Sequence, residues 1–236
     1  MKIRIKFSKL GAMKFVGHLD IMRYFQKAMR RAGVDICYSE GFSPHQIMSF
    51  AAPLGVGLTS VGEYMDIEVN HSDSSAEMIR RINETMAEGM SILDYKKLPD
   101  TAKNAMSIVA AADYRLVFRE GSEPADLEEW SKGLKNFLEL DNIPYTKKTK
   151  KGEREMNLKP LIYQSHIDKD RIFLQVSTGS LNNLKPEMVI EAYCLSLGLK
   201  LKPFALQIER QEVYADLGSE EERNLVPLSR LGEDIE

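Results

Sequence analysis

The chain has 236 residues, which fits one large domain or two small ones. Its 43% hydrophobic and 28% charged content is typical of a folded protein. Because 32 basic residues nearly balance 35 acidic ones, the net charge of the whole chain gives no argument for a nucleic-acid or membrane partner. The longest nearly apolar stretch, Phe50–Leu58, is far shorter than the roughly 20 residues of a membrane-spanning helix. The first ten residues lack the apolar core of a signal peptide. We therefore expect a cytoplasmic protein without a membrane partner.

The first half of the chain predicts the order strand, helix, strand, strand, helix, strand. Charged and apolar residues alternate along Lys2–Lys9, the period of a half-buried strand. A helix from about His18 to Ala32 follows, because apolar residues recur there at helical spacing and Gly33 ends the pattern. The other predicted elements are strands at Val34–Tyr38, Tyr64–Val69 and Ser91–Lys97, and a helix opened by the capping pair Ser74 and Glu77.

The second half repeats this pattern after a linker at Leu98–Asn104. The predicted elements are strands at Asp113–Arg119, Ile143–Lys148 and Ile172–Ser177, helices opened by Pro124 and Pro186, and a last strand at Phe204–Ile208. This order predicts an α+β fold of two tandem ferredoxin-like βαββαβ units, each an antiparallel sheet with helices on one face. We expect units at residues 1–98 and 105–215, and a flexible acidic tail at 216–236.

Charge is segregated along the chain despite the overall balance. Residues 1–33 contain nine bases and one acid, a net charge of +8, and the tail from 216 to 236 has a net charge of −5. Part of the basic segment falls on one side of the predicted first helix, at Arg23, Lys27, Arg30 and Arg31, with Lys14 and His18 just before it. Such a face suits phosphates, although a solvated surface explains it equally well.

Two loops and a basic arm are further candidates for binding nucleic acid. In the segment Tyr38–His45, two aromatic residues accompany a histidine, so Tyr38 and Phe42 could stack nucleobases or pin the loop to the core. In the segment Thr178–Pro186, Ser180 and Lys185 precede a helix and could seat an anion or simply cap the helix. The arm consists of Lys147, Lys148, Lys150, Lys151 and Arg154.

Metal and cofactor motifs are absent from the sequence. The four histidines and two cysteines are scattered, with none of the spacings that bind zinc or an iron–sulfur cluster. The pair Gly55 and Gly57 lacks the third glycine of a dinucleotide site, and there is no phosphate-binding lysine loop. We therefore expect no cofactor in this chain.

Several motifs, taken together, resemble a family of radical-SAM-linked proteins. The motifs are Gly17–Arg23, Arg30–Ala32, Tyr38–His45, Ser49–Leu54, Glu63–Asp66, Ala111–Tyr114 and Gly179–Glu187. In that family the domain is encoded beside, or fused behind, a radical-SAM enzyme, so the resemblance implies a separately encoded radical-SAM partner. A looser similarity links the chain to tandem ferredoxin-like endoribonucleases that process RNA in CRISPR systems. Those proteins carry a glycine-rich loop near the C-terminus, which is missing after Lys200 here.

The residues and the resemblance together favour an accessory RNA-recognition module without catalytic activity of its own. It would present tRNA or ribosomal RNA to the radical-SAM enzyme, with the basic helix and the arm on phosphates. One alternative is a subunit whose basic helix docks on an acidic surface of that enzyme without touching RNA. A second alternative is a metal-free endoribonuclease that uses His18 or His45 as a general acid or base.

Overall fold

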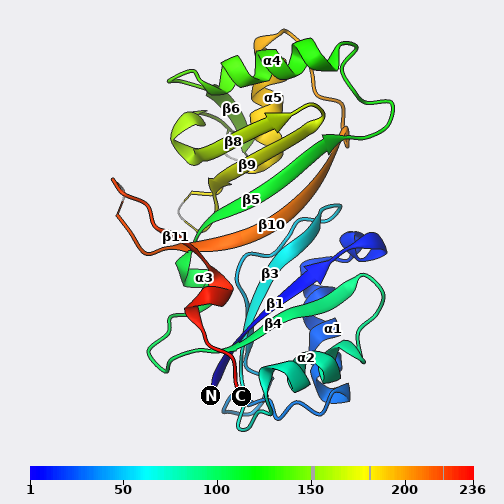
Figure 1. The fold of residues 1–236 in the computed structure, drawn as a ribbon, viewed down its shortest axis with the longest axis vertical. Coiled ribbons are helices and arrows are strands. Elements are labelled where there is room, and N and C mark those ends of the chain that lie inside the picture. Colours follow the sequence, from blue (N-terminus) through cyan, green and yellow to red (C-terminus); the bar gives the residue numbers. More distant parts are fainter. Residues whose placement is uncertain (150–151, 181, 220) are drawn as a thin grey trace. The chain divides into compact units, whose positions relative to one another are not determined.

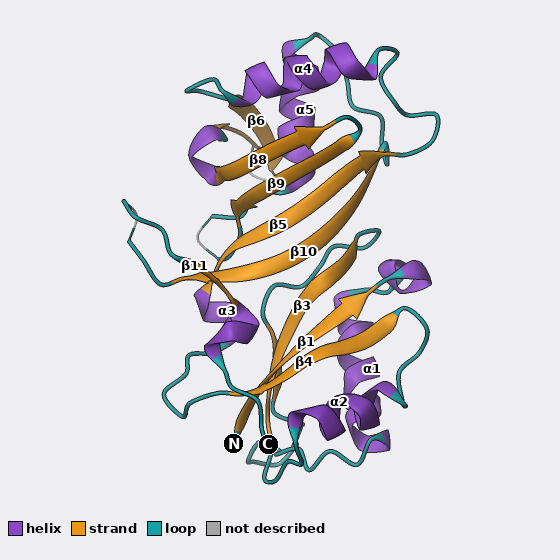
Figure 2. Cartoon of the chain, in the orientation of Figure 1, coloured by secondary structure: helices purple, strands orange, loops and turns teal. Residues whose placement is uncertain are grey.

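The computed structural model describes residues 1–149, 152–180, 182–219 and 221–236. The chain has a mixed α+β fold with mostly antiparallel strand pairing and, within these residues, five α-helices (Figures 1 and 2). It divides into two compact units. Unit 1 contains residues 1–111 and 210–236, and unit 2 contains residues 112–209.

Unit 1 begins with six elements in the order strand, helix, strand, strand, helix, strand. They are β1 (Lys2–Lys9), α1 (His18–Arg31), β2 (Met48–Phe50), β3 (Thr59–Glu68), α2 (Ser75–Asn83) and β4 (Met90–Lys97). Strand β1 lies between β4 and β3, and β2 pairs with β3 on its other edge, all antiparallel. The predicted bounds of β1 and the start of α1 are confirmed. Residues Val34–Tyr38 form only isolated bridges, at Ile36 and Tyr38, rather than a strand.

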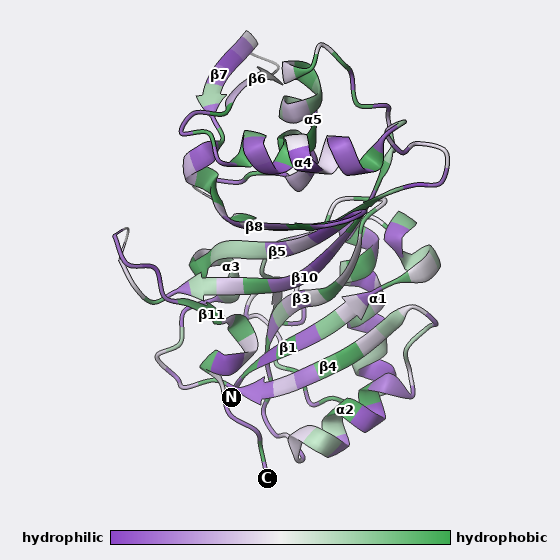
Figure 3. Cartoon of the chain, turned by 45° about the horizontal axis from the view of Figure 1, so that its top comes forward, coloured by the Kyte–Doolittle hydropathy of each residue, from purple (hydrophilic) through white to green (hydrophobic). Residues whose placement is uncertain are grey.

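Helices α1 and α2 cover the same face of the sheet of unit 1. Ile3, Ile5 and Phe7 of β1 are fully buried beneath Phe25 of α1 and Met78 of α2. The ring centroids of Phe7 and Phe25 lie 4.6 Å apart in an edge-on contact. The alternation of β1, visible as alternating hydropathy in Figure 3, therefore sends its apolar side chains to the helices.

The charged side chains of β1 are also used inside unit 1. Arg4 is 1% exposed, and its guanidinium donates to both carboxylate oxygens of Asp66 on β3, at 2.8 and 2.9 Å. Lys6 lies 2.7 Å from Glu212, and the ammonium of Lys9 donates to the carbonyl of Val16 at 2.8 Å. Three of the nine bases in the +8 segment are therefore internal.

The C-terminal segment folds into unit 1, which differs from the expected flexible tail. It contains β11 (Leu225–Pro227), which pairs with β10 (Leu206–Asp216), and the 3-10 helix η3 (Leu228–Leu231). Leu228 is fully buried, and the backbones of Lys97 and Glu233 bond each other at 2.8 and 2.9 Å. Lys96 lies 2.7 Å from Asp234, so part of the tail's negative charge is met by lysines of β4.

Unit 2 contains a run of neighbouring paired strands and a separate two-stranded hairpin. Its elements are β5 (Val109–Phe118), α4 (Leu127–Leu138), β6 (Pro144–Thr149), β7 (Gly152–Asn157), η2 (Lys159–Leu161), β8 (Ile162–Asp168), β9 (Arg171–Ser177), α5 (Pro186–Ser196) and β10. The order of these neighbouring strands is β10-β5-β9-β8, and among the described residues β6 pairs with β7 alone. The predicted strand Ile143–Lys148 thus belongs to a hairpin, and β8 takes the sheet position expected for it.

The helices of unit 2 meet through aromatic side chains. Trp130 and Phe137 of the amphipathic helix α4 contact Tyr193 of α5, with ring centroids 5.1 and 5.3 Å apart. The Tyr193 hydroxyl donates to the carbonyl of Trp130 at 3.1 Å. A Cβ at Gly133 would lie 2.0 Å from that hydroxyl, so only glycine allows this approach. Helix α4 begins after Asp126, whose carboxylate accepts from the backbone N–H of Glu129, rather than at Pro124.

The boundary between the units also differs from the expected one. Unit 1 runs through the predicted linker to Ala111 and includes the short helix α3 (Ala105–Ile108). Asp66 accepts a hydrogen bond from the backbone N–H of Ala105 at 2.7 Å, which holds this segment in unit 1. Among the described residues, no helix is long and apolar enough to cross a membrane.

Candidate nucleic-acid interface

The outer face of α1 is a row of exposed bases. Ile21, Phe25, Ala28 and Met29 of the helix are buried, whereas Arg23, Lys27, Arg30 and Arg31 are exposed. The helix starts after Gly17 without a side-chain cap and ends before Gly33, which has a φ of +63°. Because the buried and basic positions each recur at helical spacing, one side of α1 packs on the sheet and the other carries the charge.

The bases of this face differ in their contacts. Arg23 lies 3.3 Å from Asp20 in a pair that is about two-thirds exposed on both sides. Arg31 donates to the carbonyl of Thr85 at the end of α2, at 3.0 Å, and so ties the two helices together. Lys27 forms no ion pair with any residue that the structure describes. Arg23, Lys27 and Arg30 are therefore the bases of α1 best placed to meet a ligand.

Lys14 and His18 precede or open the helix and are only partly exposed. The Lys14 ammonium lies 5.2 Å from the ring centroid of Phe15, which is 66% exposed. The ring of His18 contacts that of Phe50 edge-on, with centroids 5.2 Å apart. His18 is thus a packed residue at the start of α1.

The loop between α1 and β2 is closed by hydrogen bonds near its base. Ser39 and His45 exchange three of them: the Ser39 amide to the His45 carbonyl at 2.8 Å, the His45 amide to Ser39 Oγ at 3.1 Å, and Ser39 Oγ with His45 Nδ1 at 2.8 Å. Tyr38 and Gln46 form a backbone bridge next to this pair. The segment Tyr38–Gln46, hereafter the aromatic loop, presents Phe42 with its side chain fully exposed.

The aromatic loop is attached to α1 on its basic side. The Gln46 side-chain amide donates to the carbonyl of Gln26 at 3.3 Å. Side-chain hydrogen bonds from Gln46 and Arg30 to the Tyr38 hydroxyl lower the pKa of Tyr38 below its usual value. The structure therefore brings together two of the predicted groups, the basic helix and the loop. The exposure of both rings, 47% for Tyr38 and complete for Phe42, argues against the alternative in which they pin the loop to the core.

The predicted basic arm is the hairpin β6–β7 of unit 2. In its register Lys147 pairs with Arg154, and Lys148 pairs with Glu153. Arg154 is exposed between Glu153 and Glu155. Lys150 and Lys151 lie outside the described residues. Arg154 is the one basic residue of the arm whose side chain the structure describes, and it has an acidic neighbour on each side along β7.

The predicted anion loop before α5 is also accompanied by acids. The Leu184 amide donates to the Ser177 carbonyl at 3.0 Å, and Lys185, although exposed, provides no side-chain cap to the helix. Ser180 lies in a bend of this loop and is exposed. Glu187 occupies the first turn of α5, and Glu191 one turn later accepts from the Tyr145 hydroxyl at 2.7 Å. The negative charge of these carboxylates near the start of α5 opposes a bound phosphate, so this helix N-terminus offers a weaker site for a phosphate than the face of α1.

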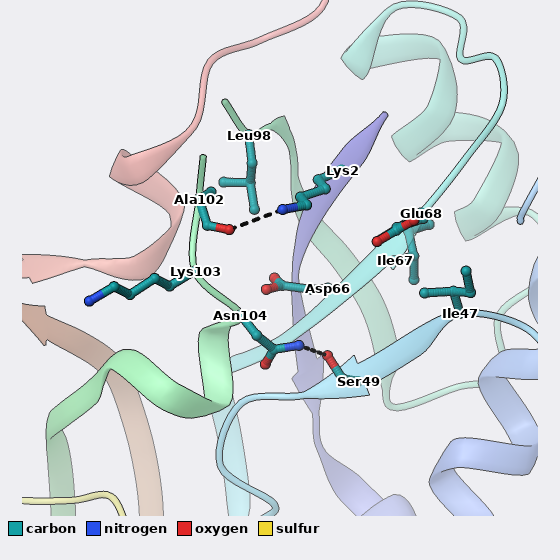
Figure 4. Close-up of a pocket in the computed structure, with 10 residues that line it drawn as sticks. All are labelled: Lys2, Ile47, Ser49, Asp66, Ile67, Glu68, Leu98, Ala102, Lys103 and Asn104. Carbon is teal, nitrogen blue, oxygen red and sulfur yellow. Dashed lines mark hydrogen bonds between the residues drawn. The ribbon is translucent and has the colours of Figure 1, made fainter. Parts of the chain in front are cut away.

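A cavity of about 180 Å³ in unit 1, lined by the start of β1, the end of β3 and the segment after β4, was not predicted from the sequence (Figure 4). Asp66 and Lys2 point toward it, but Asp66 is bound by Arg4 and Ala105, and Lys2 donates to the carbonyls of Asp100 and Ala102 at 2.9 and 3.2 Å. Asn104 donates to Ser49 Oγ at 2.6 Å. These groups bond one another and so fix the segment that joins β4 to α3. The described residues contain no cluster of potential metal ligands.

The model of a protein family described as "Uncharacterized protein conserved in bacteria (DUF2344)" matches residues 2–186, and the chain belongs to this family. No curated protein matches the sequence. A solved structure described as "Crystal Structure of a Cbf5-Nop10-Gar1 Complex" includes a similar chain, with 11% sequence identity and a TM-score of 0.46. The similarity covers 89% of this chain and 48% of that one, so this chain spans about half the length of that relative.

Proposed function

We propose that the protein is an accessory RNA-recognition module that binds RNA through α1 and the aromatic loop. The observation that supports this most is the row of Arg23, Lys27 and Arg30, exposed on one face of the helix to which Gln46 bonds the loop that carries the exposed Phe42. Guanidinium and ammonium groups bind phosphates, and an aromatic ring stacks an unpaired base. Asp20 is the single acid of α1, so this face keeps a net positive charge.

We infer in addition that each unit is ferredoxin-like. In unit 1 the order of elements is βαββαβ, and the strand order is β4-β1-β3-β2. Unit 2 has the corresponding order β10-β5-β9-β8, with the β6–β7 hairpin inserted after its first helix. Both arrangements agree with the tandem fold expected from the sequence.

The resemblance to radical-SAM-linked proteins adds a partner to the proposal. A radical-SAM enzyme needs an iron–sulfur cluster held by closely spaced cysteines, and this chain has two distant ones, Cys37 and Cys194. The chain would therefore contribute RNA recognition, and a separately encoded enzyme would contribute the reaction. The RNA class that fits this role is a structured RNA such as tRNA or ribosomal RNA.

The test is a titration of the purified chain against small RNA at several salt concentrations, with each sample also run on a denaturing gel. We expect binding that weakens steeply with salt, a log–log slope of roughly 0.7–0.9 per phosphate contact, and intact RNA. Lys27→Glu combined with Arg30→Glu should lower the affinity at least about tenfold and reduce the slope. Cleaved RNA that disappears in His18→Ala or His45→Ala would instead favour the endoribonuclease.

Helix α4 offers a matched control for this double variant. Lys132 and Lys135 are exposed on α4 with the same spacing of three residues. Lys132→Glu with Lys135→Glu makes the same change of net charge, so a loss of affinity caused only by net charge would be equal in both double variants. Unchanged affinity in the α1 variant would contradict the proposal.

A second candidate function is docking on a protein partner without RNA. It is favoured by an exposed apolar segment at the end of α5 in unit 2, formed by Leu195, Leu197, Leu199 and Phe204. Phe204 is 88% exposed and adopts a φ of +59°, a conformation that side chains rarely take. Co-purification with the radical-SAM protein after nuclease treatment tests this function. Loss of the complex in Leu199→Ser with Phe204→Ser would place docking here, and loss in the α1 double variant would place it on the basic helix.

A further inference from the structure

We propose that the aromatic loop and Arg30 form a site for one unpaired nucleotide, in which Phe42 stacks on the base and Arg30 holds the adjacent phosphate. This inference rests on the proposed function and makes it more specific. It predicts that the protein recognises single-stranded or looped-out RNA, in preference to duplex. It also assigns different roles to Tyr38 and Phe42, the two aromatic residues of the loop.

The loop is arranged before any ligand binds. Ser39 and His45 close it with three hydrogen bonds of 2.8–3.1 Å. Between them Gly41 has a φ of +106°, which a residue with a side chain rarely adopts. The conformation that exposes Phe42 is thus defined by the backbone, and a stacking base does not have to order the loop first.

Phe42 has no structural role that explains its place in the loop. Its side chain is fully exposed, whereas Phe7, Phe25 and Phe50 of unit 1 are all buried in the core. A large apolar ring held in water by a closed loop is typical of a contact residue rather than of a packing residue. Because every base has an aromatic face, a single exposed phenylalanine stacks bases with little sequence preference.

Tyr38 lies at the base of the loop and is not itself the stacking residue. It forms a backbone bridge with Gln46, whose side chain donates to the carbonyl of Gln26 on α1, one helical turn before Arg30. Gln46 and the Arg30 guanidinium lower the pKa of the Tyr38 hydroxyl, so the guanidinium lies on the side of α1 that carries the loop, where its planar fork suits a phosphate oxygen pair. Lys27, one helical turn before Arg30, extends the positive charge along the backbone path.

This arrangement discriminates between single strands and duplex on physical grounds. In a duplex both faces of each base are covered by neighbouring bases, so Phe42 gains nothing without unstacking them. The basic residues of α1 contact phosphates in single-stranded and in duplex RNA alike. Phe42 should therefore contribute to binding of single strands alone, and Lys27 and Arg30 should contribute to binding of both.

The experiment measures the affinity of the full chain for a short labelled single-stranded RNA and for the same strand annealed to its complement. Phe42→Ala should weaken single-strand binding roughly fivefold to a hundredfold and leave duplex binding and the salt slope unchanged. Phe42→Trp should restore single-strand binding. Tyr38→Phe, which removes the hydroxyl near the Arg30 guanidinium, should weaken the binding of both RNAs only slightly. Since Phe42 is fully exposed, the variants should keep the thermal midpoint of the native chain.

The outcomes separate this inference from the proposed function. Wild-type protein that binds neither RNA at low salt overturns both. Wild-type binding that Lys27→Glu with Arg30→Glu abolishes, while Phe42→Ala leaves single-strand affinity unchanged, supports the proposed function and overturns the nucleotide site. An equal loss of affinity for both RNAs in Phe42→Ala also overturns the nucleotide site, because stacking on an unpaired base cannot then be the cause.

Discussion

The outer face of α1 in unit 1 and the loop before α5 in unit 2 share the sequence pattern of an anion site, but their surroundings differ. On α1, Lys27 and Arg30 are exposed, and Asp20 is the single acid of the helix. At the start of α5, Lys185 is followed within two turns by Glu187 and Glu191. Basic residues in a sequence form a phosphate-binding surface only when the fold keeps acidic residues off the same face.

A second difference lies within the basic N-terminal segment itself. Arg4 and Lys6 belong to the same +8 stretch as Arg30, yet they lie in ion pairs with Asp66 and Glu212. The strand sends alternate side chains into the unit, whereas the outer face of α1 is left to solvent. The net charge counted along a segment of sequence is therefore larger than the charge that the segment exposes to a partner.

The largest effect is expected on stability, when the buried ion pair between Arg4 and Asp66 is broken. Asp66→Ala leaves the Arg4 guanidinium, 1% exposed, without its carboxylate and should lower the free energy of unfolding by about 3–5 kcal/mol. Urea unfolding followed by circular dichroism measures it. Asp20→Ala breaks the exposed pair with Arg23 and should cost no more than about 1 kcal/mol. Equal losses in the two variants would contradict the division into internal and surface bases.

The next effect compares the two candidate anion sites directly. Lys27→Glu should weaken RNA binding about threefold to tenfold and reduce the log–log salt slope by about one, because one phosphate contact is lost. Lys185→Glu makes the same charge change beside Glu187 and should leave affinity and slope unchanged. Fluorescence anisotropy with one labelled RNA at fixed salt measures both. A larger loss in Lys185→Glu would move the interface to unit 2.

The internal polar network of unit 1 should also respond to pH. Burial raises the pKa of Tyr64, and its hydroxyl donates to Glu212 at 2.6 Å. The unfolded chain releases this proton near pH 10 and the folded chain does not, so the stability is present below about pH 10 and is lost as the pH rises further. The loss is at most about 1.4 kcal/mol per pH unit for this group. Guanidinium unfolding at about pH 8 and about pH 11 should show a smaller decrease in Tyr64→Phe than in the native chain.

The smallest effect separates two neighbouring bases of α1. Arg31 donates to the Thr85 carbonyl, so Arg31→Ala should lower the free energy of unfolding by about 0.5–1.5 kcal/mol and change RNA affinity little. Arg30→Ala should have the opposite profile, with lower RNA affinity and almost unchanged stability. Unfolding curves and anisotropy on the same two preparations provide the comparison. Equal changes of stability and of RNA affinity in the two variants would contradict the separate roles of Arg31 in stability and Arg30 in RNA binding.

Much of the fold could be predicted from local patterns. The alternation of Lys2–Lys9, the apolar stripe of α1 and the Ser74 cap of α2 each depend on residues close in sequence, and all three are confirmed. The role of β8 could not be predicted in this way. Both β6 and β8 have strand-forming sequences, and only pairing with β9 decides which one joins the sheet.

The sequence by itself determined the basic character of α1 and the aromatic content of the loop after it. Only the tertiary structure decided that Gln46 bonds the loop to α1, that Phe42 stays exposed, and that the acidic C-terminal segment packs in unit 1. The physical reason is the range of the interactions. Helix and strand periodicity follow from neighbouring residues, whereas ion pairs such as Arg4–Asp66 join residues distant in sequence and appear only when the chain has folded.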